Sequence, residues 1–519
     1  MRFSHRVDID EPNPIAKAEA ALKAQGVRLR ALNDSNPTRH GLAPSSLPEA
    51  YAADPRGQRY AREAIAAYIN ASVNAAGSGA ITGTSGHDDV TGSGDVTSNG
   101  GGDDISGDEM LTGSSGIDDS TGGDGGNANG GESAARNNAA HSGDTTGNGA
   151  ATCNRATGDS SGAAYNGALG DEGPTSGMGA ARNNAARDGD AACGSAAGSG
   201  GAGAEATAQD VYLLSSTSQA YAWLMKLLCD AGDAILAPKP GYPLIESIAR
   251  LECVKTQCYQ LRFDGSWFID VPQIARMLEE DTARRIRALV VINPNNPTGS
   301  YVKPSEREAL VELCIRYGIA IIADEVFFDY PLEPFAGNRR FSGESRVLTF
   351  ALDGFSKTLA APHAKVGWIR VSGPAADVRE ARRRLDVIAD DFLPMSEFVA
   401  REVPGMLREA PRQLAAVGER VRANLAVLHR MLDADVLGVV DVLRAEGGWN
   451  VLLRFPGVID ENDLVLSMID TARTSGQPGY FFDMTSNGYL AISLLPVTGI
   501  FEEHVRIVLD AVRQRLDNR

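Results

Sequence analysis

An apolar run that ends in an asparagine- and proline-rich turn is the feature that most constrains the fold. Residues 288–292 read Ala-Leu-Val-Val-Ile without polar alternation, which is typical of a strand buried on both faces of a sheet. Residues 293–299 read Asn-Pro-Asn-Asn-Pro-Thr-Gly and stop that strand. Ligands of open α/β sheets bind at the carboxyl ends of strands, so Asn296 is placed to contact one. The alternative is a rigid turn without chemistry.

Two further apolar runs are followed by residues whose ionisable side chains can take part in a reaction. Residues 319–323 form a second buried-strand pattern that leads directly into Asp324. Residues 347–352 form a third, which is followed by the segment containing Lys357. An asparagine, an aspartate and a lysine therefore each follow a predicted strand, in that order along the chain.

This ordered set resembles the class I and II aminotransferases among the fold-type I pyridoxal-phosphate enzymes. The family motifs read NPxNPTG, then DE-V-Y/F, then S-x-S-K, and the resemblance covers nearly all of the chain outside one low-complexity segment. It implies an α/β fold, with a mostly parallel sheet sandwiched by helices in a large domain and a smaller α+β domain. It also implies pyridoxal 5'-phosphate as cofactor and a homodimer with its site between domains and across the subunit interface.

The resemblance assigns roles around the cofactor ring. Lys357 is the amine that holds the cofactor as a Schiff base and then carries a proton, so Lys357 and Asp324 are the catalytic residues. Asp324 pairs with the ring nitrogen, and Asn296 donates to the phenolic oxygen. Tyr242 stacks on the ring, and Ser356 adds a hydroxyl near the phosphate.

The phosphate site is expected where a strand meets a helix. Residues 214–220 are rich in hydroxyls, and a helix N-terminus binds anions through its free N–H groups. By resemblance, Ser216, Thr217 and Ser218 hold the phosphate; ordinary N-capping is the alternative. Tyr51 reaches the phosphate of the neighbouring subunit or is a turn residue. Lys365 stands where the family has an arginine, and supplies charge without a bidentate fork.

Two more departures from the family pattern concern hydrogen-bond donors. Phe327 stands where a tyrosine hydroxyl usually reaches the phenolic oxygen. Ala491 stands where an arginine usually binds the substrate carboxylate. Arg39 and Arg454 are the candidate replacements, with a solvated surface charge as the alternative for each.

One segment has a composition unlike the rest. Residues 74–207 contain 34 of the 57 glycines, with 18 acidic and 4 basic residues, so they carry −14 of the net charge of −18. Such a segment buries too little apolar surface to offset its ordering entropy, which predicts a disordered acidic insertion. Loose Gly/Asp repeats leave a calcium-binding β-roll as the alternative. The negative net charge of the protein therefore says nothing about the residues outside this segment, and it gives no support to nucleic-acid binding.

The domain prediction follows these boundaries. Residues 1–50 are assigned to the N-terminal part of the small domain, 51–73 and 208–372 to the large cofactor-binding domain, and 373–519 to the C-terminal small domain. Strands are also predicted at 211–214, 234–237, 366–371 and 447–455, and helices at 61–72, 218–229, 244–251, 271–280, 305–317, 376–387 and 413–432.

The predicted function is amino-group transfer between an amino acid or related amine and a keto acid. Within the same fold, a β-eliminating lyase or a decarboxylase remains open, as does a degenerate cofactor-binding protein without activity. The six cysteines lack the paired spacing of a zinc site, and no metal is predicted. No apolar run reaches the roughly 18 residues of a membrane span and no signal peptide is evident, so we expect a cytoplasmic protein without a nucleic-acid or membrane partner.

Overall fold

The computed structural model describes residues 1–6, 21, 24–26, 54–77, 205–334 and 337–517. Arg39, Tyr51 and nearly all of the predicted insertion lie outside these ranges. The predictions of disorder, of calcium binding and of roles for those two side chains therefore stay predictions.

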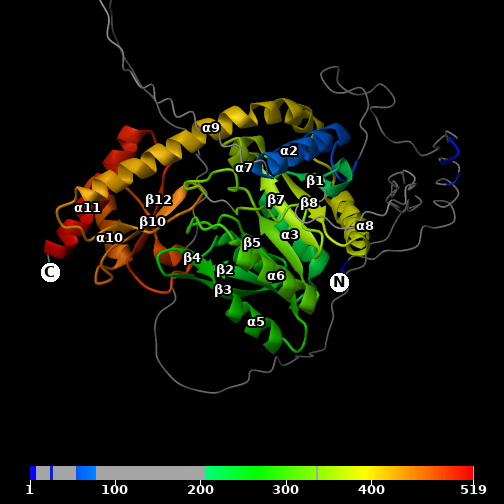
Figure 1. The fold of residues 1–519 in the computed structure, drawn as a ribbon, viewed down its shortest axis with the longest axis horizontal. Helices are drawn as coiled ribbons and strands as arrows, with labels where there is room; N and C mark the ends of the chain where they lie inside the picture. The colour runs from blue at the N-terminus through cyan, green and yellow to red at the C-terminus, as the bar shows by residue number, and fades with distance from the viewer. Residues whose placement is uncertain (7–20, 22–23, 27–53, 78–204, 335–336, 518–519) are drawn as a thin grey trace, which may run out of the picture. The chain divides into compact units, whose positions relative to one another are not determined.

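The larger sheet has eight strands in the order β1-β8-β7-β6-β5-β2-β3-β4 (Figure 1). The five strands from β7 to β3 in that order are parallel, while β8, β1 and β4 each pair antiparallel with a neighbour. The predicted, mostly parallel α/β sheet is thus confirmed. The strands are β1 Val211–Leu214, β2 Ala234–Lys239, β3 Lys255–Phe263, β4 Trp267–Ile269, β5 Ile286–Ile292, β6 Ala320–Asp324, β7 Thr349–Gly354 and β8 Gly367–Ser372.

Apolar residues on both faces of the central strands explain why helices cover both sides. In β5, Val290 packs into the core that includes residues of α3, α4 and α8, while Leu289 packs into the core that includes α5 and α6. The side-chain period of two in a strand produces this division. The helices around this sheet are α2 Arg59–Gly77, α3 Thr217–Leu228, α4 Leu244–Leu251, α5 Val271–Glu280, α6 Pro304–Tyr317, α7 Phe355–Thr358 and α8 Ala375–Phe392, with short 3-10 turns η2 Ala208–Asp210 and η3 Pro362–Ala364.

A smaller antiparallel sheet follows in the sequence, with the strand order β11-β12-β10-β9. Val451, Leu453 and Leu490 on one face of it form a third core with the second half of α9 and with α10 and α11, while Leu452 and Ala491 pack into the core that includes α5 and α6. The elements are β9 Asp441–Val442, β10 Asn450–Arg454, β11 Gln477–Pro478, β12 Tyr489–Ser493, α9 Glu397–Asp433, α10 Glu461–Ala472, α11 Thr498–Asp517 and the 3-10 turn η4 Gly479–Phe482.

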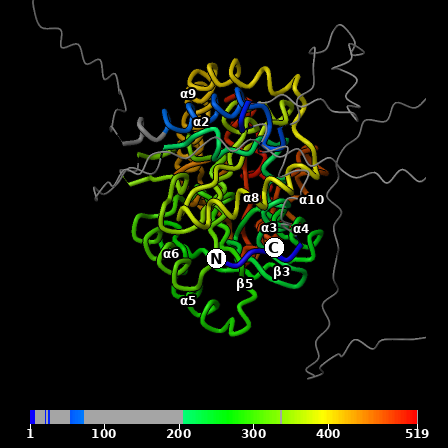
Figure 2. The backbone as a smooth tube through the Cα atoms, turned by 90° about the vertical axis from the view of Figure 1, so that its right-hand side faces the viewer, coloured from blue at the N-terminus to red at the C-terminus, as the bar shows by residue number. Residues whose placement is uncertain are grey.

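Helix α9 begins at Glu397, so the predicted start at residue 413 is wrong. Pro404 and Pro411 lie inside the helix, although proline removes a backbone donor and normally ends one. The first half persists because Ala400 and Val403 are fully buried in a core shared with α2. Helices α2 and α9 lie side by side in both views (Figures 1 and 2).

Residues on both sides of the predicted domain boundary at residue 373 belong to the core of the larger sheet. Helix α8 lies beyond that boundary, yet Val378, Ala381 and Leu385 pack into the core of the larger sheet. Phe3, near the N-terminus, packs against the same core. The core of the larger sheet thus includes α8, while the first and second halves of α9 contribute to two other cores, and the boundary at residue 373 stays a prediction. None of the helices in the described part of the chain is long and apolar enough to cross a membrane.

A loop of the smaller sheet is bonded to the asparagine-rich turn of the larger one. The Gly299 carbonyl accepts N–H bonds from Glu446 and Gly447, each at 2.9 Å. A Cβ at Gly299 would lie 2.6 Å from the Ala445 Cβ, and one at Gly447 would lie 2.6 Å from the Tyr301 ring. Gly299 therefore needs glycine because the backbone of the facing loop comes so close, and Gly447 needs it because the Tyr301 ring lies against it.

We expect Gly299→Ala to destabilise the protein more than Gly438→Ala. Both glycines have positive φ, +68° and +56°, which costs an alanine about 1–2 kcal/mol. Only Gly299 is crowded, since a Cβ at Gly438 meets nothing within 4 Å, and overpacking adds about 1–3 kcal/mol. Urea denaturation of both variants gives the comparison, and equal losses of unfolding free energy would contradict it.

Candidate active site

Five of the predicted site residues follow the carboxyl ends of strands at one edge of the larger sheet. Strands β1, β2, β5, β6 and β7 all run in the same direction, β1 through its antiparallel pairing with β8. Their carboxyl ends lead to Ser216, Tyr242, Asn296, Asp324 and Lys357 in turn. This edge is where ligands bind in open α/β sheets.

Lys357 lies in the short helix α7 with its amine against two aromatic rings. Its Nζ is 5.0 Å from the centroid of the Phe327 ring and 4.8 Å from that of Trp449. The two rings themselves meet edge to face at 5.4 Å. Burial lowers the pKa of Lys357, while the Asp324 carboxylate acts in the opposite direction. A lowered pKa increases the fraction of neutral amine, which is the nucleophilic form.

Asp324 is buried at the end of β6. Burial raises its pKa to about 6, against three groups that stabilise the carboxylate. These are the Val326 N–H at 3.3 Å, the Tyr221 hydroxyl at 3.0 Å and the positive charge of Lys357. Tyr221 lies on α3 and was not predicted from the sequence. It holds Asp324 from the helix that begins at the proposed phosphate site.

Asp353 fixes the turn that carries Lys357. One oxygen of its carboxylate accepts the Gly354 N–H at 2.7 Å and the Thr358 hydroxyl at 3.0 Å. The Tyr330 hydroxyl donates to the Lys357 carbonyl at 2.6 Å. Three hydrogen bonds therefore hold the chain on both sides of the Lys357 side chain.

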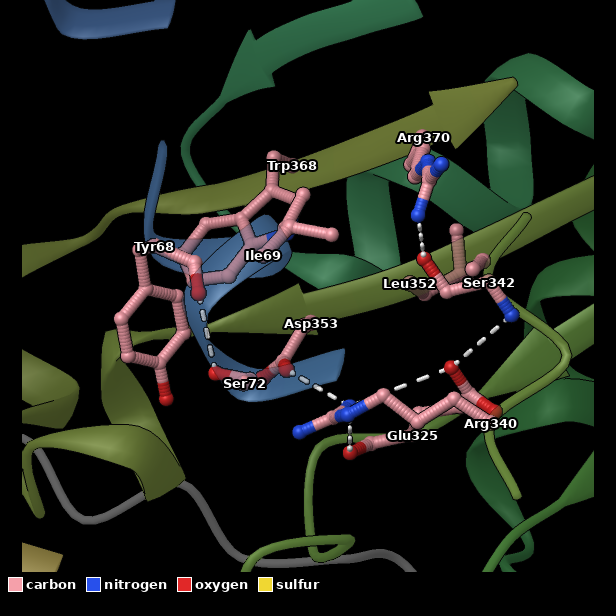
Figure 3. Close-up of a pocket in the computed structure, with 11 residues that line it drawn as sticks. Tyr68, Ile69, Ser72, Glu325, Arg340, Ser342, Leu352, Asp353, Trp368 and Arg370 are labelled. Atoms are coloured by element: carbon pink, nitrogen blue, oxygen red, sulfur yellow. Dashed lines mark hydrogen bonds and ion pairs between the residues drawn. The ribbon is translucent and has the colours of Figure 1, made fainter. Parts of the chain in front are cut away.

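The half-buried Arg340 links this turn to the end of β6 (Figure 3). Arg340 donates to Asp353 at 3.2 Å and to Asp329 at 2.7 Å, and its Nη1 lies 3.8 Å from the Glu325 carboxylate. Burial raises the pKa of Asp353 to about 7, although Arg340 opposes that shift. Tyr68, on α2, donates to Asp329 at 3.0 Å. Glu325 follows Asp324 at the end of β6, and Asp353 lies in β7 just before the Lys357 turn. The Arg340 guanidinium therefore connects the ends of these two strands.

The hydroxyl-rich residues lie at the first turn of α3. Ser216 is the N-cap, and its Oγ accepts the Gln219 N–H at 3.1 Å, so the N-capping interpretation holds for this residue. Thr217 and Ser218 are the first residues of the helix, where backbone N–H groups have no intrahelical acceptor. A Cβ at Gly367 would lie 3.1–3.3 Å from Ser216 and Thr217 backbone atoms, so β8 comes close to this turn.

The other predicted cofactor contacts, Tyr242, Ser356 and Lys365, differ in how far they are exposed. Tyr242 is 41 % exposed, and burial together with Asp324 raises its pKa, so its hydroxyl lies within electrostatic reach of that carboxylate. Ser356 is half-buried in α7, and Lys365 is exposed with φ +52°. Gly354 has no room for a side chain, since a Cβ there would lie 2.8 Å from the Val366 carbonyl oxygen.

Arg454, a predicted substrate contact, is paired with a residue outside the predicted site. It lies at the end of β10, half-exposed, and forms an ion pair with Asp441 at 2.9 Å. Ala491, where the family arginine is missing, is buried opposite Leu452 of β10. The site contains no group of three or more histidine, cysteine, aspartate or glutamate residues suited to a metal ion within the described ranges.

Two neighbours in the smaller sheet complete the described site and were not predicted. Trp449 contacts Lys357, and its indole N–H is buried without an acceptor among the described residues. Asn450 donates through Nδ2 to Oδ1 of Asn296 at 3.1 Å. The Gly447-Gly448 pair before them was the only local signal, because paired glycines mark a close backbone approach.

The chain belongs to the class I and II aminotransferase family, whose family model matches residues 188–497. A tyrosine aminotransferase of Caenorhabditis elegans is 26% identical over 234 residues, covering 45% of this chain and 50% of the relative. A glutamate–pyruvate aminotransferase of Haemophilus influenzae is 29% identical over 184 residues, covering 36% of this chain and 45% of the relative. The matched region thus spans about half the length of these curated relatives.

Solved structures show the same fold. An alanine aminotransferase from Pyrococcus furiosus superposes with a TM-score of 0.54 at 21% identity, over 60% of this chain and 78% of that one. A tyrosine aminotransferase from Leishmania infantum gives 0.54 at 20% identity, over 59% and 75%. The fold is that of the fold-type I aminotransferases.

Pyridoxal 5'-phosphate is the cofactor that this membership implies, and the described residues fit it. A pyridinium nitrogen needs a carboxylate, and Asp324 is a buried one beside an amine of lowered pKa. A phosphate needs N–H donors, and the first turn of α3 offers them. The buried indole N–H of Trp449 is a further donor without an acceptor in the described part.

We expect Tyr221→Phe to destabilise the apoprotein more at pH 7.5 than at pH 5. Burial raises the pKa of Asp324 from 3.8 to about 6, so the native state loses stability as the pH rises through that interval, and the Tyr221 hydroxyl reduces this loss. Removing a hydrogen bond to a charged group is worth about 1.5–3 kcal/mol, and the protonated carboxyl at pH 5 loses less.

The matched control is Tyr259→Phe. Tyr259 is equally buried, but its hydroxyl donates to the Val290 carbonyl at 2.9 Å, which does not titrate. Its effect on the urea midpoint stays constant between the two pH values. A Tyr221→Phe effect that is also constant would show that this hydroxyl does not stabilise the carboxylate.

Proposed function

We propose that this protein is a pyridoxal-phosphate-dependent aminotransferase that uses Lys357 to move an amino group between an amino acid or related amine and a keto acid. The observation that carries the proposal is the paired placement of Lys357 and Asp324. The amine has a lowered pKa against two aromatic rings, and the carboxylate is buried within its electrostatic reach. A structural lysine on the surface would need neither feature.

The proposed holding residues follow the chemistry of the cofactor. When bound, pyridoxal phosphate supplies an electron-withdrawing ring that stabilises negative charge at the α-carbon of the substrate. Asp324 would hold the proton of the ring nitrogen in place, and Asn296 would donate to the phenolic oxygen. Tyr242 would cover one face of the ring.

The phosphate would be held at the first turn of α3. Thr217 and Ser218 offer backbone N–H groups and hydroxyls there, and the N-cap Ser216 keeps the turn in place. Ser356 and Lys365 are proposed as further phosphate contacts. Tyr51 and Arg39 lie outside the described residues; we propose Tyr51 for the phosphate of a neighbouring subunit and Arg39 for the substrate carboxylate. Arg454 is not part of the proposal, since its side chain pairs with Asp441.

Lys357 is the proposed proton carrier. Its Nζ forms no ion pair with a carboxylate in the described part of the chain and lies against aromatic rings instead, so a proton on it is not locked in an ion pair. Phe327 and Trp449 exclude water from one side of the amine, which keeps its pKa low. An amine of this kind can take a proton from a substrate carbon and return it elsewhere.

We also propose that the protein is a homodimer, divided into a large cofactor-binding domain and a small domain. Three large apolar side chains, Phe392, Leu393 and Phe398, are at least 50 % exposed where α8 ends and α9 begins. Exposed apolar residues close together in sequence support a covered surface. Light scattering should give twice the chain mass of 54.7 kDa, and a mass of one chain would contradict the dimer.

A lyase is the second candidate function. The matched relatives include an S-alkyl-thiohydroximate lyase of Arabidopsis thaliana, 27% identical over 41% of this chain and 46% of the relative. A lyase releases product from one amino-acid substrate, whereas a transaminase needs a keto acid as well. Omitting the keto acid therefore separates the two functions.

We expect purified protein supplied with pyridoxal phosphate to consume an amino donor only when pyruvate or 2-oxoglutarate is present. A screen of amino donors with each keto acid, followed by chromatography of both products, measures this. Lys357→Ala should reduce the rate at least a thousandfold, as expected when a nucleophile is lost. The control is Lys255→Ala, which removes an exposed lysine of β3. Turnover without a keto acid, or unchanged turnover in Lys357→Ala, would contradict the proposal.

A further inference from the structure

Asn296 meets a second amide from the smaller sheet. Nδ2 of Asn450, the first residue of β10, donates to Oδ1 of Asn296 at 3.1 Å, across 154 residues of sequence. The other two asparagines of the turn are engaged elsewhere. Asn293 Oδ1 accepts the Val302 N–H, and Asn295 Nδ2 donates to the Pro240 carbonyl. Of these three asparagines, Asn296 is the one whose side chain bonds to the smaller sheet among the described residues.

The backbone before Asn450 is fixed against the larger sheet. The N–H groups of Glu446 and Gly447 bond to the Gly299 carbonyl, and Gly448 N–H bonds to the Tyr330 carbonyl at 2.9 Å. Trp449 packs edge to face against Tyr330 at 5.1 Å. These contacts leave Asn450 little freedom to move relative to Asn296.

One hydrogen bond decides which way the Asn296 amide faces. A carboxamide has an acceptor oxygen on one side and a donor NH2 on the other. Asn450 occupies the oxygen with a donor, and Nδ2 of Asn296 has no hydrogen bond to any described residue. The donor side of this half-buried amide is therefore free for an acceptor in the site.

We propose that Asn450 is a positioning residue that holds the Asn296 carboxamide with its NH2 available to the phenolic oxygen of the cofactor. This inference rests on the proposed function. The orientation of Asn296 matters more here because Phe327 has no hydroxyl, which leaves Asn296 as the remaining donor for that oxygen among the predicted residues. Without Asn450, the amide can rotate by 180° and present its oxygen to an oxygen, which is repulsive.

The test measures affinity for pyridoxal phosphate rather than activity. The apoprotein is titrated with the cofactor, and the dissociation constant is read from the quenching of tryptophan fluorescence. Asn450→Ala should weaken binding about three- to tenfold, the size expected for one hydrogen bond. Asn450→Asp should weaken it at least as much, because a carboxylate facing Asn296 accepts from the NH2 and turns the amide the wrong way.

A double-mutant cycle separates positioning from a general structural effect. In the Asn296→Ala background, Asn450→Ala should change the dissociation constant by less than twofold, because the residue it positions is gone. The matched control is Asn462→Ala, which removes a side-chain hydrogen bond with Tyr480 elsewhere in the region of the smaller sheet and should leave cofactor binding unchanged.

The outcomes distinguish the inference from the proposed function. Equal losses from Asn450→Ala in the native and Asn296→Ala backgrounds would overturn the positioning role, as would tight binding by Asn450→Asp. If Lys357→Ala and Asn296→Ala both bind the cofactor like the native chain, the proposed function itself fails. A selective loss in Asn296→Ala without one in Asn450→Ala leaves the proposed function standing and removes the inference.

Discussion

Burial of the Asp324 carboxylate is the constraint on which the rest of the site depends. A buried carboxylate resists ionisation, and burial raises the pKa of Asp324 to about 6 against the three groups that stabilise its charge. One of these groups, the Tyr221 hydroxyl, comes from α3. The same helix begins at Thr217, so α3 both bonds to Asp324 and forms the proposed phosphate site. A single rigid helix thus sets the spacing between two contacts that one cofactor would need.

The second constraint is the close approach of the two sheets. Gly299 and Gly447 let two backbones bond directly, and this contact delivers Trp449 to Lys357 and Asn450 to Asn296. The site is therefore not a property of the larger sheet alone. Arg340 also joins Asp353, at the end of β7, to Glu325, which follows β6 (Figure 3).

Local signals in the sequence were enough to predict the central strands of the larger sheet, but not β3, β4 or most strands of the smaller sheet. The apolar runs before Asn296, Asp324 and Lys357 became β5, β6 and β7 with boundaries shifted by at most two residues. Tyr221, Asp353 and Asn450 could not be predicted, because tyrosine, aspartate and asparagine are common and their roles arise from contacts. The Tyr221 contact spans 103 residues, and no periodicity reports such a distance. The early start of α9 was missed for a related reason, since tertiary packing overrode its two prolines.

The central claim is that Lys357 is the amine that holds pyridoxal phosphate. Borohydride reduction of the protein mixed with the cofactor fixes the cofactor to whichever lysine carries it, and peptide mass mapping then identifies that lysine. We predict one pyridoxyl group per chain, on the peptide that contains Lys357. A label on another lysine, or no label at saturating cofactor, would contradict the account.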